Sequence, residues 1–178
     1  MRALRSFARD DHGAAGVEFA LIAPGMIALL FGMIEVNELI IANNRTLMVA
    51  SSVADVASRA TTLKDADVSG LFNAAGTVMY PGSKDLLQLR LSSVEVTGPG
   101  KGQVLWSDAH GLTAHSVGAN LTLPSTVENP CTGPSIIYAE AEFSYTSPAG
   151  MVLGSDPYVL KQQVVMCPRV VNTVARIA

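Results

Sequence analysis

Residues 12–36, HGAAGVEFALIAPGMIALLFGMIEV, contain the feature on which the predicted fold depends. From Ala14 to Ile34 the chain has 21 residues and a single charged side chain, that of Glu18. A helix of 21 residues, with a rise of about 1.5 Å per residue, extends roughly 31 Å and matches the ~30 Å hydrocarbon core of a bilayer. The sequence therefore predicts a transmembrane helix close to the N-terminus.

The residues that flank this apolar run give the helix a direction. Arg2, Arg5 and Arg9 precede it, and no basic residue immediately follows it. Because basic flanks stay in the cytoplasm, we expect a cytoplasmic N-terminus and a C-terminal part across the membrane. The predicted segments are a leader (1–13), a transmembrane helix (14–35), an amphipathic continuation of that helix (36–63) and a head domain (64–178).

Three kinds of segment can begin in this way. A cleaved signal peptide needs small residues just after the apolar run, where this chain has Glu35 followed by VNELII. A simple signal anchor is possible but does not explain Glu18, since a carboxylate deep in a bilayer costs about 2.5–3.5 kcal/mol on insertion scales. A prepilin leader explains both features. A position of Glu18 near the lipid headgroups, where its cost is small, stays open.

The string HGAAGVEFA at residues 12–20 resembles the processing site of type IV prepilins. In that site a glycine precedes the cut, and a glutamate followed by an aromatic residue stands at the fifth mature position. Here the corresponding residues are Gly13, Ala14, Glu18 and Phe19. Cleavage would leave a free amine on Ala14, one helical turn from Glu18. We expect Glu18 in the first turn, where the helix dipole favours negative charge.

The helix is expected to bend within the membrane and to continue beyond it. Pro24 costs about 3 kcal/mol in a water-exposed helix interior, but neighbouring groups make it tolerable in a membrane helix, with a kink or a loosened turn. Apolar residues then recur at spacings of three and four from Val36 to Leu63, which predicts a broad apolar helical face. Two separate helices with a break at Asn43-Asn44 are the alternative.

The head domain is expected to contain one short helix and several strands. Asp67 is placed to cap a helix over residues 68–79, and turn residues follow it. Alternation over residues 86–97 predicts a half-buried strand, with a phase change near Ser92-Ser93 that indicates a bulge. A hairpin turn is expected at 98–102, and further strands at 103–107, 116–123, 136–145 and 158–166. The predicted class is α+β, with an antiparallel sheet packed on the C-terminal half of the long helix.

Cys131 and Cys167 are the two cysteines, too few for a tetrahedral zinc site. We expect them to form a disulfide in an exported domain, with two buried thiols as the alternative. Asp108, His110 and His115 could suggest a metal cluster, but such residues in an irregular segment are more often ordinary surface residues. We therefore expect no metal and no cofactor.

Charge and motifs limit the function classes. The net charge of −3 and a pI of about 5.5 argue against nucleic-acid binding, which calls for a clustered basic face. No nucleophile elbow, convincing triad or paired acids are found in the sequence. We expect a structural protein and not an enzyme.

Taken together, the chain resembles the TadE-like minor pilins, or pseudopilins, of the tight-adherence (Flp) type IV pilus system. Residues 12–36 carry most of the likeness. Softer support comes from four further stretches: DVSGLFNAAGTVMYP (67–81), VLWS (104–107), IIYAEAEFSYTSP (136–148) and CPR (167–169).

This resemblance implies processing by a prepilin peptidase, an inner-membrane pool with a periplasmic head, and a role in initiating, capping or otherwise enabling pilus assembly for surface adherence. It implies that Glu18 pairs with the N-terminal amine of a neighbouring subunit. The implied partners are other minor pilins, the major pilin and the inner-membrane assembly platform. A pseudopilin of a secretion system, and a signal-anchored periplasmic binding or enzymatic domain, are the rival functions.

The processing hypothesis makes a direct prediction about the mature N-terminus. N-terminal sequencing or mass spectrometry of the assembled protein should return AAGVEF, because the cut falls between Gly13 and Ala14. An intact Met1 in assembled material would refute it.

Overall fold

The computed structural model describes residues 14–80, 82–124, 131, 133–147 and 157–177. The fold is α+β, as predicted. The chain divides into two compact units, residues 1–38 and 39–178, here called the N-terminal unit and the head unit. The elements are, in order, α2 (Ala14–Arg59), β1 (Thr62–Leu63), α3 (Asp65–Val78), the 3-10 turn η2 (Lys84–Leu86), β2 (Leu87–Gly98), β3 (Lys101–His110), β4 (Asn120–Thr122), β5 (Ser135–Tyr145), β6 (Tyr158–Met166) and β7 (Ala175–Arg176).

Helix α2 is a single helix of 46 residues. It passes through Asn43-Asn44 without a break, which confirms the continuous helix. The predicted end at Leu63 is wrong, because α2 stops at Arg59 and Thr62–Leu63 pairs in parallel with β7. The β-branched pair Thr61-Thr62 favours this extended conformation over a further helical turn.

The buried face of α2 in the head unit consists mainly of small side chains. Ala50, Ala54 and Ala57 are fully buried, and small residues allow the sheet to approach the helix closely. The predicted apolar face was too broad, because Ile40 and Val56 are about half exposed. The sheet needs only a narrow stripe of the helix.

Helix α3 begins at Asp65, three residues earlier than predicted, and Asp67 is not its N-cap. Asp67 lies inside the first turn, where its carboxylate accepts a hydrogen bond of 2.9 Å from the backbone N–H of Lys64. The acid therefore still supports the helix start, as the glutamate of a capping box does. Val68 and Phe72 are buried and anchor the helix.

The five strands β4-β3-β2-β5-β6 form an antiparallel sheet in that order. The predicted strands at 136–145 and 158–166 are confirmed, and the predicted bulge lies between Ser93 and Val94 in the β2–β3 pairing. The hairpin turn is shorter than predicted, since only Pro99 and Gly100 separate β2 from β3. Gly100 has a φ of 65°, which glycine adopts without strain. β4 keeps only three residues of the strand expected at 116–123.

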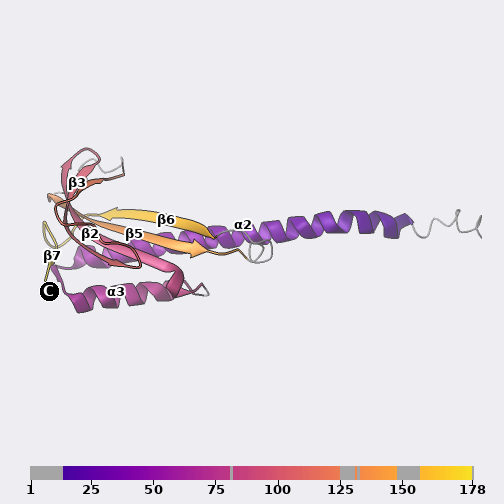
Figure 1. Cartoon of the computed structure of the whole chain (residues 1–178), viewed down its shortest axis with the longest axis horizontal. Helices are drawn as coiled ribbons and strands as arrows, with labels where there is room; N and C mark the ends of the chain where they lie inside the picture. Colours follow the sequence, from indigo (N-terminus) through magenta and orange to yellow (C-terminus); the bar gives the residue numbers. More distant parts are fainter. Residues whose placement is uncertain (1–13, 81, 125–130, 132, 148–156, 178) are drawn as a thin grey trace, which may run out of the picture. The chain divides into compact units, whose positions relative to one another are not determined.

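The sheet has a core on each face. On one face, Leu89, Leu91 and Ile137 pack in a core that also contains buried residues of α2 and α3. This arrangement confirms a sheet packed on the C-terminal part of the long helix, and Figure 1 shows α2 and α3 beside the strands. On the other face, Ile136 and Tyr138 pack in a smaller cluster with Leu123, and the partly buried Cys131 packs against this cluster.

Cys131 and Cys167 form the predicted disulfide, across a sequence separation of 36 residues. It ties the segment before β5 to the residue that follows β6. The bridge therefore links Cys131, which packs against the smaller core, to the end of β6.

The double variant Cys131→Ser/Cys167→Ser should lose about 3–4 kcal/mol of unfolding free energy, because the bridge closes a loop of 36 residues. The measurement is urea unfolding of the full chain in detergent, followed by the fluorescence of Trp106, the single tryptophan. As a control, a reductant should shift the wild-type curve and leave the variant's curve in place. Equal midpoints for the oxidised wild type and the variant would contradict the expectation.

Candidate functional site on the N-terminal helix

The N-terminal unit exposes an unusually apolar helical surface. Every large apolar side chain of α2 between Val17 and Ile34 is exposed, including Phe19 at 70% and Leu21 at 80%. Each Å² of apolar surface left in water costs about 25 cal/mol of free energy compared with buried surface. Soluble monomers rarely leave so large a continuous apolar patch exposed. By length and composition, this helix can cross a membrane.

One side of this helix is slightly hollowed. The hollow has a volume of about 520 Å³ and an apolar lining that includes Phe19, Ala23, Met26, Leu30 and Met33. Their spacing of three and four residues places them on one helical face. Ala23 is small and the two methionines are flexible, and such side chains suit close packing against another apolar helix.

The structure describes three of the four predicted processing and assembly residues, all near the start of this surface. Ala14 is the first residue of α2, and Gly13 lies outside the described residues. Phe19 lines the apolar hollow. Glu18 is exposed, but it is the fifth residue of the helix and the first turn contains no acid. The predicted first-turn position is therefore wrong, and the helix dipole adds little at Glu18 because it fades beyond the first turn.

Pro24 lies inside α2, as predicted. Proline has no backbone N–H to donate. The carbonyl of Ala20, one turn before Pro24, therefore lacks its usual hydrogen-bond donor. In a bilayer that carbonyl must be satisfied by local adjustment or by a neighbouring group. The predicted kink at this position stays a prediction.

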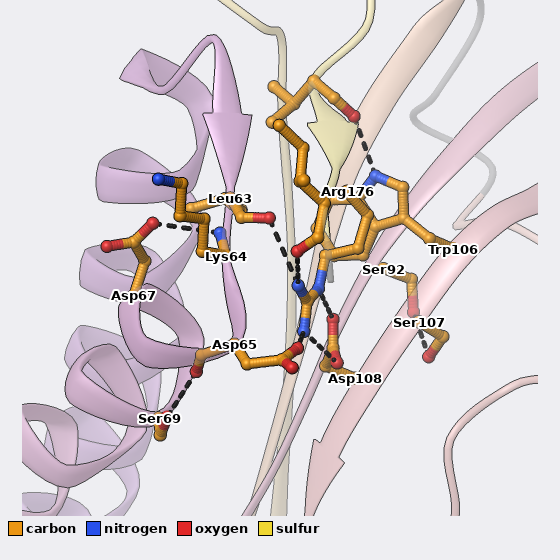
Figure 2. Close-up of polar contacts among 12 residues, drawn as sticks. Leu63, Lys64, Asp65, Asp67, Ser69, Ser92, Trp106, Ser107, Asp108 and Arg176 are labelled. Carbon is orange, nitrogen blue, oxygen red and sulfur yellow. Dashed lines mark hydrogen bonds and ion pairs between the residues drawn. The ribbon is translucent and has the colours of Figure 1, made fainter.

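A second feature, in the head unit, is a cluster of ion pairs around Arg176 (Figure 2). The guanidinium donates to Asp108, with Nε to Oδ2 at 2.7 Å, and to Asp65. It also donates to the carbonyl oxygens of Leu63 and Ile177, at 3.2 and 2.6 Å. The hydrogen bond to Asp108 is the main reason that the pKa of Arg176 is raised above its ordinary value. The cluster joins β7, β3, β1 and the start of α3.

A hollow of about 290 Å³ lies beside this cluster and is lined by Phe72, Asn73 and His110 as well as by the charged residues. Its charged side chains, Asp65, Asp108 and Arg176, are already paired with one another. These charged side chains therefore stabilise the fold and are not available to bind a charged ligand in the hollow.

A third feature is the carboxylate of Glu140, which is largely buried. Its Oε2 accepts from Arg90 Nε at 2.5 Å and lies 3.1 Å from His115 Nε2. Burial acts to raise the pKa of Glu140, but the hydrogen bond and charge of Arg90, helped by His115, hold that pKa below its ordinary value. Arg90 also donates to the Thr113 carbonyl at 2.9 Å. These bonds fasten the segment after β3 across the sheet.

The residues considered for a metal cluster are not brought together. Asp108 pairs with Arg176, His115 pairs with Glu140, and His110 lies beside the ring of Phe72 at 6.5 Å. Within the described residues, no group of three or more histidine, cysteine or acidic side chains is placed to hold a metal ion.

Comparison with protein-family models, curated proteins and solved structures gives no match to this chain. What remains is its architecture. The topology is pilin-like. A long apolar N-terminal helix carries, on its C-terminal part, a domain with an antiparallel sheet.

The ion pairs of the head unit were missed in the sequence. Alternation along the strands does place Arg90 and Glu140 on the polar face of their strands. Their pairing, however, depends on the register between β2 and β5, which sets these two residues directly opposite each other. A sequence pattern gives the face of a strand but not its register against a strand 50 residues away.

Glu140→Gln should lower the unfolding free energy by about 1–3 kcal/mol at neutral pH, because Arg90 then loses its charged partner in a largely buried position. The pKa of Glu140 is lower in the folded chain than its ordinary value of 4.5. Its stabilising effect is therefore full above that value and disappears as the pH falls through the lowered one. The measurement is urea unfolding at several pH values, in which the gap between wild type and variant should close in acid.

The matched control is Glu142→Gln, two residues along the same strand. Glu142 pairs with Lys161, whose side chain is 62% exposed, and exposed pairs contribute only about 0–1 kcal/mol. An equal loss in the two variants, or a gap that does not depend on pH, would contradict the assignment.

Proposed function

We propose that this chain is a minor pilin or pseudopilin, cleaved after Gly13 by a prepilin peptidase and needed for the assembly of a tight-adherence (Flp) type pilus. The observation that carries the proposal is the exposed apolar surface of α2 from Val17 to Ile34, continuous in one helix with the core of a folded head unit. The resemblance of residues 12–20 to a prepilin processing site adds the chemistry of maturation and assembly.

In this function the apolar half of α2 has two successive environments. Before assembly it spans the inner membrane, with the head unit in the periplasm. In the filament it is buried among the corresponding helices of other minor pilins and the major pilin. Both environments remove the same apolar side chains from water, so the transfer between them leaves the hydrophobic contribution to the free energy nearly unchanged.

Glu18 supplies what the apolar surface cannot, which is a preferred register. An ionised carboxylate with no partner is costly in an apolar environment. Pairing with the free N-terminal amine of a neighbouring subunit removes that cost at one relative position of the two helices. The subunit therefore does its work by shape and charge, without catalysis, together with the assembly platform that extracts it from the membrane.

The features of the head unit are consistent with a structural role. Arg176 donates to Asp108 and to the carbonyl of Leu63. In a separate cluster, Arg90 donates to Glu140 and to the carbonyl of Thr113. Each cluster connects elements that are far apart in the sequence. A secretion-system pseudopilin would share all of these features. Piliation assays and the neighbouring genes distinguish the two roles.

Glu18→Ala should leave cleavage after Gly13 largely intact and strongly reduce the number of pili, because the variant loses the charge that sets the register. Immunoblotting of membranes measures cleavage, and electron microscopy with sheared-filament recovery measures piliation. The matched control is Glu38→Ala, an exposed acid of the same helix outside the apolar run. Normal piliation in Glu18→Ala would overturn the mechanism, and so would an equal defect in both variants.

A further inference from the structure

The head unit has two ends along α2, and its contacts define them. Near one end, the Gln162 side chain of β6 donates to Asn43 Oδ1 at 2.7 Å. Near the other, the Arg169 backbone N–H donates to the Ser58 carbonyl at 2.7 Å. The chain from Gln162 to Arg169 therefore runs in the same direction as α2. Tyr158, which precedes Gln162, lies at the end where α2 enters the head unit, and we call this the proximal end.

Other elements reach the same proximal end. Tyr158 stands opposite Tyr145 in the β5–β6 pairing. Leu87, which follows η2, pairs with Phe143 near the end of β5. A methyl group on Gly82 would lie 3.1 Å from the Phe143 ring, so the turn after α3 is also here. Figure 1 shows α3 and β5 ending, and β6 beginning, at this end of the head unit.

The proximal end exposes large side chains that a water-facing surface does not need. Tyr80 is 81% exposed, Tyr158 56%, Val159 51% and Leu86 41%. Three of the four tyrosines of the chain are at this end, whereas the fourth, Tyr138, is buried in the smaller core. Tyrosine has an apolar ring and a polar tip, and it is enriched where a protein meets the boundary between membrane and water.

Among the described residues of β5, β6 and η2, the charges close to these side chains come in pairs of opposite sign. Lys161 pairs with Glu142, and Lys84 and Asp85 are adjacent in η2. A surface of this composition is not selected for strong attraction to anionic lipid. It fits the mixed polar and apolar layer of lipid headgroups through its aromatic and aliphatic side chains.

The length of the chain keeps this end close to the bilayer. Ile34 is the last residue of the apolar run, and Leu39 is the first residue of the head unit. Even a fully extended chain of five residues spans at most about 17 Å. With Ile34 at the membrane surface, as the proposed function has it, Leu39 lies within that distance of the surface.

We propose that Tyr80, Leu86, Tyr158 and Val159 form a collar that contacts the headgroup layer on the periplasmic face of the membrane while the subunit is stored there. The inference rests on the membrane-anchored state of the proposed function and adds a second membrane contact to it. The collar limits the tilt of the stored head unit, and extraction into a filament has to break its contact with lipid. Because the contact depends on aromatic and aliphatic groups, raising the salt concentration should not release it.

The test places nitroxide spin labels on the full chain in phospholipid nanodiscs that hold one copy each. Both native cysteines are in the disulfide, so one added cysteine gives a single labelling site. Labels at Tyr80→Cys and Tyr158→Cys should be several-fold less accessible to a water-soluble nickel chelate than a label at Val117→Cys. Val117 is the matched control, since it is 74% exposed and lies next to the β2–β3 turn end of the sheet, away from the collar.

A label at Leu29→Cys, in the apolar run, separates the two levels of the proposal. If it is accessible to oxygen but not to nickel while the collar labels are as accessible to nickel as the Val117 label, the collar is wrong and the anchor stands. If the Leu29 label is itself open to nickel, anchor and collar are both overturned. Protection of the collar labels that appears only when several copies share a membrane would assign the surface to a neighbouring subunit and would also overturn the collar.

Discussion

A single helix, α2, has to be compatible with two different environments along its length, and the rest of the structure depends on this constraint. Over its first half, α2 exposes large apolar side chains such as Leu21 and Leu29 to whatever surrounds it. Over its second half, the same helix buries Ala50, Ala54 and Ala57 in the core of the head unit. The size of the side chains marks the change. Large residues suit lipid or the helices of other subunits, whereas small ones let a sheet lie close to the helix.

The C-terminal end of the chain fixes where that helix stops. The Arg169 backbone binds the Ser58 carbonyl in the last turn, and β7 then pairs with β1 directly after the helix. Arg176 donates to the carbonyl of Leu63, and the Trp106 ring donates to the Val174 carbonyl at 2.8 Å (Figure 2). The last residues of the chain therefore close the domain around the end of its first element, and the disulfide at Cys167 holds their starting point.

Local patterns were sufficient for the elements whose cause is local. The apolar run predicts the long helix, alternation predicts the strands and the bulge after Ser93, and the two cysteines predict the disulfide. The end of α2 was misplaced because the residue that pairs with Thr62 is Ala175, more than a hundred positions later. The start of α3 was misplaced because Asp67 can support a helix from inside its first turn as well as from the cap. Of the candidate assembly site, the positions on α2 follow from the sequence, but the partner proposed for Glu18 belongs to a neighbouring subunit and not to this chain.

The proposed storage and assembly states differ less in hydrophobic burial than in their specific contacts. Lipid and a bundle of neighbouring helices both remove the side chains from Val17 to Ile34 from water, so that burial alone favours neither state. In the proposed function Glu18 favours the filament, since only there would its carboxylate meet the N-terminal amine of a neighbouring subunit. The proposed collar at the proximal end would favour the membrane. Each of these two opposing contacts contributes little free energy compared with the burial of the helix. A subunit held in the membrane in this way can still be extracted. In the proposed function, the assembly machinery would have to overcome only the collar contact and the barrier of extraction, and the proposed charge pair would set the final position of the subunit.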